Sequence, residues 1–426
     1  MKGKLDILIK NAEELLTLDS TLSGPRRGKQ MGELGIIQRG ALGIKDEKIV
    51  SVGTIDQILK ETEINEKTEI IDASGKVVTP GLVDPHTHLV FAGTREDEFE
   101  ERISGKTYQE IEARGGGIRA TVKKVRQSTK EELVELALTR LERMLKQGTT
   151  TVEVKSGYGL NLNDEFKILE AVRDLNHIQP VELIPTFLGA HQIPDEFKEE
   201  RTDYIELLIE EMIPQVAERR LAEFCDVFCE DGAFTDEESK EILSTGKKAG
   251  LIPKIHADEL SPYGGAELAA QVGAISADHL VYASLEGIRK MRESGVIAVL
   301  LPGTSFFLNS ERYAPARKMI QEGLPVALAT DFNPGSCMTE SMPLIINLAC
   351  LKMGLTPAEA IVAATINAAY AIGREEKIGS FQRGKIADVV IWDFPRYRIL
   401  PYHFGVTLAE TVIKKGKVLI ERGNKR

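Results

Sequence analysis

The sequence predicts an α/β protein, a (β/α)8 barrel of the TIM type inserted into a small β-sandwich domain that is built from both termini. From Gly81 onward, strand-length apolar segments alternate with helix-length segments, which is typical of βα units around a parallel sheet. About eight such strands are present, and eight strands close this kind of barrel. The two ends of the chain show only short strand patterns. We therefore expect a discontinuous β-domain at 1–80 and 374–426, and a barrel at 81–373.

The terminal strands are predicted from alternating polar and apolar residues between turn-forming residues. In the N-terminal part these segments are LDILIKN, GALGIKDEKIVSVG and TEIIDASGKVVTPG. After Gly373 the helical pattern stops, and KIADVVIWD and AETVIKKGKVLIERG return to a strand pattern. We expect these late strands to rejoin the N-terminal ones, with the barrel inserted between them.

The barrel units are predicted from helix ends and apolar strands. In STKEELVELALTRLERMLKQG, Ser128 and Glu131 have the spacing of a capping box, and Gly148 ends the apolar helical spacing. The strand TTTVEVK follows directly. Further strands are expected at the segment ending in Thr87 and at VELIPTFL, AEFCDVFC, LIPKIHAD, AISADHLV, VIAVLLP and LPVALATD. The glycine-rich segment 114–120 is expected to form a mobile loop over the site.

Composition limits the possible partners. The 426 residues carry a formal net charge of −11, which disfavours nucleic acid and anionic membranes because an acidic field repels phosphate. An anionic substrate would then need a local basic clamp. The apolar runs are far shorter than the roughly 20 residues of a membrane span, and the N-terminus lacks a signal core, so we expect a cytoplasmic protein. The four cysteines are expected to be reduced, with Cys225 and Cys229 as packing thiols rather than a metal pair.

Histidine is scarce in this chain, and most copies lie where strands end. Of seven histidines, five occupy such positions: His86, His88, His191, His256 and His279. The C-terminal strand ends of a barrel carry its functional groups, so these side chains should converge. The HxH pair at His86 and His88 faces one way on a strand and is either structural or able to share a cation. With His256 and Asp331 at further strand ends, a zinc or iron site with room for water is favoured.

Three further residues near these strand ends have two interpretations each. Glu259, three residues after His256, is either a proton acceptor facing the metal or a solvated loop acid. His279 either contacts water or a developing oxyanion, or is a satisfied core histidine. Lys155 is either carboxylated between two metals or an ion-pair partner of Glu153 or another neighbour.

Several segments together resemble the amidohydrolase superfamily and, within it, the imidazolonepropionase family over nearly the whole chain. The segments that carry this resemblance are ASGKVVTPGLVDPHTHL, HTHLVFAGTREDEF, YQEIEARGGGI, EVKSGYGL, TFLGAHQIP, HADEL, SADHL, TDFNPGS, KIGSFQRGKIADVVIWD and YHFGV. The resemblance implies hydrolytic opening of the ring amide of 4-imidazolone-5-propanoate to N-formimidoyl-L-glutamate, in histidine degradation. It also implies one Zn²⁺ or Fe³⁺ per chain, a homodimer, and a structural rather than a metal-bridging Lys155.

The resemblance assigns roles residue by residue. The implied metal ligands are His86, His88, His256 and Asp331. The implied contacts to the small anionic substrate are Arg95, Tyr158, His191, Glu259 and Ser336, with product contacts at Asn333 and Gly335 and a weaker candidate at Tyr108. The catalytic groups are Glu259 as proton shuttle, His279 as oxyanion contact, and Asp331. Without the resemblance, Arg95 reads as surface charge and Tyr158 as a packing aromatic.

Two rival functions stay open at this point. One is another amidohydrolase, either a two-metal cyclic amidase with a carboxylated Lys155 or a deaminase of an aromatic ring that releases ammonia. The other is a non-catalytic scaffold of the same fold. A scaffold would be expected to have lost metal ligands, whereas this sequence keeps all four.

Overall fold

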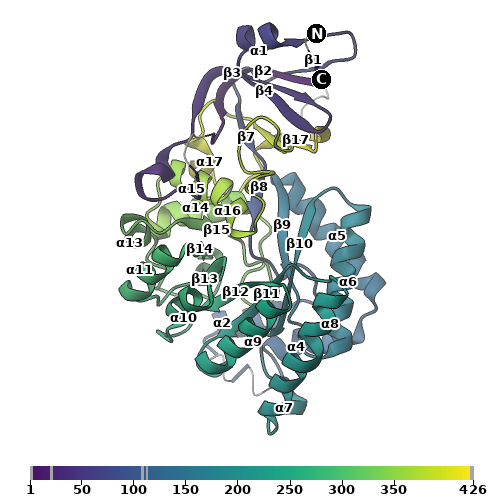
Figure 1. The fold of residues 1–426 in the computed structure, drawn as a ribbon, viewed down its shortest axis with the longest axis vertical. Coiled ribbons are helices and arrows are strands. Elements are labelled where there is room, and N and C mark those ends of the chain that lie inside the picture. The colour runs from purple at the N-terminus through teal and green to yellow at the C-terminus, as the bar shows by residue number, and fades with distance from the viewer. Residues whose placement is uncertain (1–2, 20–22, 107–109, 112–113, 423–426) are drawn as a thin grey trace.

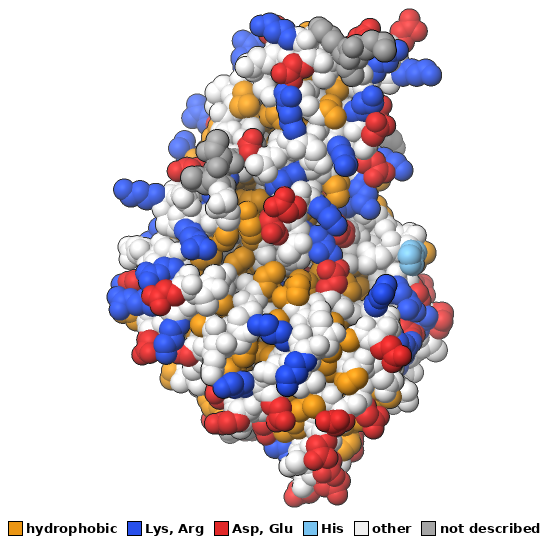
Figure 2. Space-filling view, viewed as in Figure 1, with side chains coloured by type: hydrophobic (Ala, Val, Ile, Leu, Met, Phe, Trp, Pro, Cys, Tyr) orange, Lys and Arg blue, Asp and Glu red, His pale blue; other side chains and the backbone are white. Residues whose placement is uncertain are grey.

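The structure is a computed structural model that describes residues 3–19, 23–106, 110–111 and 114–422. Figure 1 shows two parts, a β-rich part that holds both ends of the chain and a larger part in which helices surround a ring of strands. The space-filling view of the same face shows acidic and basic side chains interspersed, with acidic ones gathered at the lower tip (Figure 2). Among the described residues, no helix is long and apolar enough to cross a membrane.

The larger part is a parallel barrel of eight strands, as predicted. Each strand pairs with the next along the chain, in the order β8 to β15. The strands are β8 (Leu82–Asp84), β9 (Thr149–Lys155), β10 (Glu182–Ala190), β11 (Phe224–Cys229), β12 (Ile252–Ala257), β13 (Ser276–His279), β14 (Ile297–Leu300) and β15 (Val326–Leu328). The ring closes just beyond β8 and β15, where Thr87 bridges Phe332 and the amide of Asp331 donates to the carbonyl of His86 at 3.0 Å.

Helices connect successive strands and cover the outside of the barrel. The main ones are α5 (Lys130–Lys146), α6 (Leu162–Ile178), α9 (Asp236–Lys248), α10 (Gly265–Val272), α11 (Leu285–Ser294) and α14 (Met342–Met353). Shorter ones are α2 (Glu96–Ile103), α4 (Ile118–Gln127), α7 (Arg201–Glu206), α8 (Ile213–Glu218), α12 (Pro302–Phe307), α13 (Ala316–Gln321), α15 (Pro357–Ala363) and α16 (Ile366–Ala371), with a π-helical turn at Leu207–Met212.

The cap of α5 differs by one residue from the prediction. Thr129, not Ser128, is the N-cap, and its side chain accepts from the amide of Glu132, which completes the capping box. Ser128 instead ends α4, and its hydroxyl donates to the carbonyl of Lys124 at 3.0 Å. Because both hydroxyl residues have an acid three positions later, spacing alone does not decide between them.

The smaller part combines strands from both ends of the chain, as predicted. Its main sheet has the order β18-β17-β16-β7-β2-β3-β4, with β6 also paired to β2, and β1 pairs β5 in a separate two-stranded sheet. The strands are β1 (Gly3–Lys4), β2 (Ile7–Leu16), β3 (Ile36–Lys45), β4 (Lys48–Thr54), β5 (Thr62–Glu63), β6 (Glu69–Asp72), β7 (Val77–Pro80), β16 (Val389–Trp392), β17 (Ala409–Lys414) and β18 (Lys417–Glu421). Strand β16 lies antiparallel beside β7, so the two ends meet there. The exact domain limits at residues 80 and 374 stay a prediction.

Three local expectations need correction or fall outside the description. Helices do not stop at Gly373, because α17 (Ile399–Tyr402) forms between β16 and β17, and α1 (Ile55–Glu61) interrupts the N-terminal strands. The predicted loop at 114–120 ends at Gly117, because α4 begins at Ile118. Tyr108 lies outside the described residues.

Candidate metal centre and active site

The four predicted metal ligands come from three strand ends and lie together at the mouth of the barrel. His86 and His88 follow β8, His256 is near the end of β12, and Asp331 follows β15. Asp331 Oδ1 lies 3.4 Å from His86 Nε2 and 3.6 Å from His88 Nε2. The rings of His86 and His256 are 4.5 Å apart between centroids. All four side chains are buried, so the cluster is an interior site rather than a surface patch.

His279 and Glu259 adjoin this cluster. The ring of His279 lies 5.2 Å from that of His256 and 5.4 Å from that of His86. Its Nδ1 atom is 3.5 Å from Glu259 Oε1. One nitrogen each from His86, His256 and His279 lies within 4.8 Å of the others, as do ligand atoms of His86, His88 and Asp331. The geometry therefore brings both proposed catalytic side chains beside the ligand set.

Two carboxylates lie behind two of the ligand histidines. Asp278 Oδ2 is 2.7 Å from His86 Nδ1, and Asp226 Oδ2 is 3.0 Å from His256 Nδ1. Such contacts fix a ring and leave the other nitrogen free to bind metal. Within the described part of the chain, the buried Nε2 atom of His86 and both ring nitrogens of His256 have no hydrogen-bond partner, so Asp226 approaches His256 Nδ1 as a close contact rather than a directed hydrogen bond. Orphaned buried nitrogens beside a carboxylate are the donor set that a zinc or iron ion would satisfy.

Lys155 contacts both of these carboxylates and also Glu153. Its Nζ atom is 2.7 Å from Asp226 Oδ2, 2.9 Å from Glu153 Oε1 and 3.3 Å from Asp278 Oδ2. Burial alone would lower the pKa of Lys155, but the three carboxylates outweigh it and raise that pKa above its usual value. Carboxylation requires a neutral amine, so this environment opposes a carbamate at Lys155.

Burial controls the protonation of the ligand set. It lowers the pKa of His86, His88 and His279 well below the usual value, so these rings are neutral near pH 7. Burial also raises the pKa of Asp331 to about 6, even though its Oδ2 accepts a hydrogen bond from the Thr304 hydroxyl at 2.6 Å. His279 and Asp331 both have positive φ angles, 76° and 55°, which are uncommon for residues with side chains and cluster at functional sites.

The loop that carries Glu259 is fastened by two other acids. Glu230 Oε2 accepts from the amides of Glu259 at 3.0 Å and Leu260 at 2.9 Å. Asp258 accepts from the amides of 263–266, at the first turn of α10. Burial, with the nearby charges of Asp331 and Glu230, raises the pKa of Glu259 well above its usual value. Glu259 is therefore a rigidly placed carboxyl that holds its proton more strongly than an exposed glutamate.

Arg95 approaches the site from the start of α2. Its Nε and Nη2 atoms donate to Glu98 Oε2 at 3.0 and 2.7 Å, while its Nη1 atom faces Gly335. A Cβ atom at Gly335 would overlap Arg95 Nη1, so a larger residue at this position would displace the guanidinium from its present place. Arg102 Nη1 donates to the carbonyl of Gly335 at 3.2 Å. A second arginine, which sequence reasoning did not single out, thus lies against the same glycine as Arg95.

Tyr158 and His191 lie beside His88. The ring of His191 stacks on that of His88 at 5.0 Å, and Tyr158 lies 5.5 Å from His88 and 5.6 Å from His191 between centroids. His191 Nδ1 lies 3.0 Å from the carbonyl of Gly157 and, as the donor, leaves Nε2 as an acceptor. Burial lowers the pKa of His191 to about 3, so the ring is neutral.

Asn333 and Ser336 form a turn after Asp331. Asn333 Oδ1 accepts from the amides of Gly335 and Ser336, each at 2.8 Å, and its Nδ2 donates to the carbonyl of Asp331 at 2.7 Å. The side chain of Asn333 is thus used within the turn, where it holds Gly335 and Ser336 against the site. A direct contact between Asn333 and a ligand stays a prediction.

The residues missed by sequence reasoning are mostly partners of the predicted ones: Asp226, Asp278, Glu230, Thr304, Glu98 and Arg102. One signal was available for two of them. Asp226 is a lone charge inside the apolar strand FCDVFC, and Asp278 directly precedes His279 at the end of another. A buried carboxylate in such a strand requires a partner, which the sequence alone does not identify.

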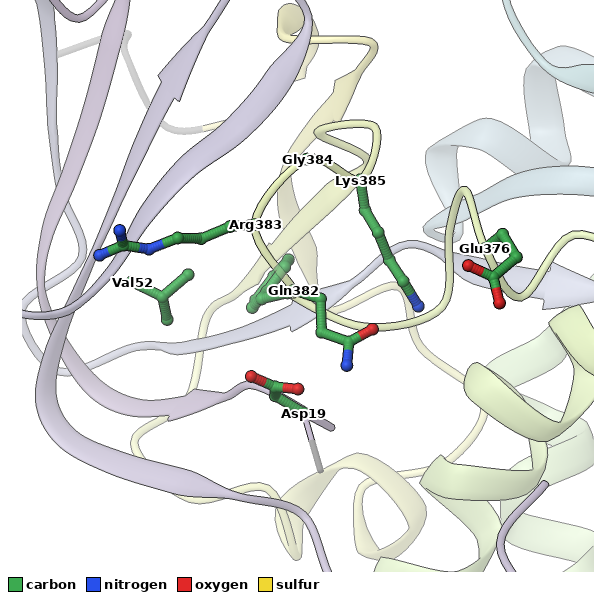
Figure 3. Close-up of a pocket in the computed structure, with 8 residues that line it drawn as sticks. Asp19, Val52, Glu376, Gln382, Arg383, Gly384 and Lys385 are labelled. Atoms are coloured by element: carbon green, nitrogen blue, oxygen red, sulfur yellow. The ribbon is translucent and has the colours of Figure 1, made fainter. Parts of the chain in front are cut away.

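A separate pocket of about 630 Å³ lies away from the histidine cluster, between β4 and the segment before β16. Figure 3 shows Asp19, Glu376, Arg383 and Lys385 among its lining residues. It contains none of the predicted site residues, and the histidines remain the candidate centre.

Comparison with known proteins places the chain in a family. The amidohydrolase family matches residues 77–419. Imidazolonepropionase from Geobacillus kaustophilus is 53% identical over 418 residues, which cover 98% of both chains, and that from Symbiobacterium thermophilum is 52% identical over 423 residues, 99% of both.

Solved structures show the same fold at low sequence identity. A 5-methylcytosine deaminase from Klebsiella pneumoniae has a TM-score of 0.73 at 17% identity and covers 98% of each chain. A zinc-bound adenosine deaminase from Xanthomonas campestris has a TM-score of 0.69 at 17% identity, over 99% of this chain and 94% of that one. The family match and the full-length relatives agree: this chain belongs to the amidohydrolase family and, within it, to the imidazolonepropionases.

Proposed function

We propose that this enzyme opens the ring amide of 4-imidazolone-5-propanoate with one water molecule and forms N-formimidoyl-L-glutamate. The observation that carries this proposal is the juxtaposition of His86, His88, His256 and Asp331 with Glu259 and His279 at one barrel mouth. The full-length resemblance to imidazolonepropionases supplies the substrate.

His86, His88, His256 and Asp331 would hold one Zn²⁺ or Fe³⁺ ion. Three imidazoles and a carboxylate suit either metal. A second ion would need a bridging carboxylated lysine, but Lys155 already contacts three carboxylates and its pKa is raised. These contacts support a single-metal site.

When bound, the ion supplies Lewis-acid chemistry, in that it makes water nucleophilic near neutral pH and polarises a carbonyl oxygen. Glu259 takes the proton of the attacking water and returns it to the ring nitrogen as the carbon–nitrogen bond breaks. Its raised pKa suits a group that must both accept and donate a proton. His279, neutral and 3.5 Å from Glu259, is placed to hydrogen-bond the developing oxyanion.

Arg95, Tyr158 and His191 would bind the substrate's propanoate and ring. The Nη1 edge of Arg95 faces Gly335, and a guanidinium suits a carboxylate ligand. Gly335 and Ser336, held in their turn by Asn333, lie beside this edge of Arg95, and the Ser336 hydroxyl would add a contact to the substrate. A local clamp of this kind lets a chain of net charge −11 bind an anion.

We further propose a homodimer and a cytoplasmic location, both of which rest on the resemblance. Sedimentation equilibrium of the purified chain tests the first, and cell fractionation tests the second.

Metal content and turnover together test the proposed function. We expect about one zinc or iron per chain by elemental analysis, loss of the imidazolone chromophore on incubation with 4-imidazolone-5-propanoate, and no ammonia. Chelation should abolish turnover, and zinc should restore it. Two metals per chain with a carbon dioxide adduct on Lys155 would favour a cyclic amidase, and ammonia release from an aromatic ring would favour a deaminase.

A further inference from the structure

Two ligand histidines in this site are supported by one shared cation. His86 contacts Asp278 at 2.7 Å and His256 contacts Asp226 at 3.0 Å, each on the Nδ1 side. The same Oδ2 atoms lie 3.3 and 2.7 Å from Lys155 Nζ. An unbroken path of contacts therefore runs from His86 through Asp278, Lys155 and Asp226 to His256.

We propose that Lys155 is a positioning residue, which sets the orientation of His86 and His256 for metal binding by holding Asp278 and Asp226 in place. This inference rests on the metal site proposed above. Lys155 touches neither metal ligand in this arrangement; it acts through the two carboxylates.

The electrostatics of the barrel interior make this cation necessary. The side chains of Asp226, Asp278 and Glu153 are fully buried. Water does not screen their negative charges there, so the three carboxylates repel one another strongly. The ammonium of Lys155 donates hydrogen bonds to Glu153 and Asp226 and forms an ion pair with Asp278 at 3.3 Å. Without Lys155, Asp226 and Asp278 would lose the contact that holds them in place, and each would release the histidine that it orients.

The second buried lysine of the barrel, Lys254, also lowers the pKa of Asp278 through its charge, but it makes no ion pair with Asp278 or Asp226 among the described residues. Lys254 Nζ donates to the carbonyls of Pro85 at 3.3 Å and Ala371 at 3.5 Å, and it lies 4.0 Å from Glu153 Oε1. Among the described residues, Lys155 is the lysine that forms ion pairs with Asp226 and Asp278.

The test is zinc affinity, measured on metal-free protein by competition with a chromophoric chelator. Removal of a group that orients a metal ligand typically weakens metal binding 10- to 100-fold, and we expect a loss of about this size for Lys155→Met. With saturating zinc, KM should stay near the wild-type value, because Lys155 is assigned no substrate contact.

Lys414→Met is the matched control. Lys414 is also a buried lysine, 2.7 Å from Asp388 Oδ2, but it belongs to β17 in the terminal sheet. This variant should lose stability and keep its zinc affinity. Zinc affinity of folded Lys155→Met within twofold of wild type, or an equal loss in Lys414→Met, overturns the proposal.

A second variant tests the proposal independently if Lys155→Met does not fold. Asp278→Asn keeps Lys155 and interrupts the same path, so its zinc affinity should also fall about 10- to 100-fold. Wild-type affinity in folded Asp278→Asn overturns the proposal. If wild-type protein itself binds no zinc or iron, the proposed metal site fails rather than the role of Lys155.

Discussion

At the scale of single residues, the position of Glu259 is set by groups that do no chemistry themselves. Glu230 binds the amides of Glu259 and Leu260, and Asp258 binds the first turn of α10, so the loop between β12 and α10 is anchored at both ends. The carboxyl group of Glu259 itself stays next to His279. Catalysis by a proton shuttle depends on such fixed placement.

Glu259→Gln isolates the proton-transfer role. Glutamine keeps the shape and hydrogen-bonding reach of glutamate but does not accept the proton. General acid–base catalysis typically contributes about 10² to 10⁴ in rate, so kcat should fall by a factor in that range. Steady-state kinetics, with elemental analysis of the same sample, measures the effect.

Metal content is the internal control for this variant, and it should stay near the wild-type value. A normal kcat in fully metallated Glu259→Gln would transfer the shuttle role to His279 or Asp331. Loss of metal together with activity would make Glu259 a ligand and change the coordination set.

At this scale the sequence predicts the histidines of the site better than the carboxylates that hold them in place. Histidines at strand ends follow a topological rule, because the C-terminal ends of barrel strands meet at one mouth. Asp226 and Asp278 follow no such rule, since their partners His256 and His86 come from other strands. Their roles depend on the register between strands, which no local pattern encodes.

At the scale of elements, the passage from α5 to β9 brings the barrel against the terminal sheet. Gly148 follows α5 with a φ of 92°, and a Cβ there would lie 3.2 Å from both Trp392 and Val390 of β16. Gly250 occupies the same place between α9 and β12, with a φ of 93° and open space around its Cβ position. The two glycines therefore share a backbone conformation and differ in packing.

Gly148→Ala should destabilise the protein more than Gly250→Ala. The positive φ alone costs about 1–2 kcal/mol for a residue with a side chain, and this applies to both. Crowding against Trp392 and Val390 should add roughly 1–3 kcal/mol at position 148. Urea unfolding of both variants measures the difference, and equal losses would show that the contact with β16 relaxes freely.

The elements themselves were predictable because their signals are local. Runs of apolar residues predict β9 to β15, and alternating polar and apolar residues predict the terminal strands. What failed was finer: the cap moved from Ser128 to Thr129, and the short helix α17 carries the sequence ILPY, which has no helical period to detect. Helices of one turn are decided by tertiary packing, here of α17 against α14.

At the scale of the whole molecule, charged side chains buried near the junction join the terminal sheet to the barrel. Lys414 of β17 pairs with Asp388 at 2.7 Å and reaches the barrel at Thr151 of β9, 3.5 Å away, and at Glu182 of β10, 4.0 Å away. Lys385 lines the pocket of Figure 3, within the terminal β-domain, where its Nζ donates to Ser380 Oγ at 2.7 Å and to the carbonyl of Ile378 at 3.3 Å. Within the described part of the chain Lys385 forms no ion pair, whereas Lys414 does, so the charge of Lys385 is less well compensated.

The pH dependence of stability should reveal Lys385. Burial lowers its pKa from 10.5 to about 8, despite the opposing charges of Glu376 and Asp19. Between these two values the unfolded chain holds the proton that the folded chain has released. The contribution of Lys385 to the free energy of unfolding therefore rises with pH in this window, by at most about 1.4 kcal/mol per pH unit, and is constant below it.

Lys385→Met removes this contribution, so the difference in unfolding free energy between wild type and variant should be flat below about pH 8 and rise in favour of wild type from there to about pH 10.5. Urea unfolding at a series of pH values gives this difference curve.

Lys240→Met, on the exposed face of α9, controls for the loss of an amine from the surface. Because the difference cancels the titration of all other groups, its shape reports Lys385 alone. A difference curve that is level across the window, or that matches the curve of Lys240→Met, would contradict this prediction. It would mean that the folded protein keeps Lys385 protonated because water or nearby acids compensate its charge.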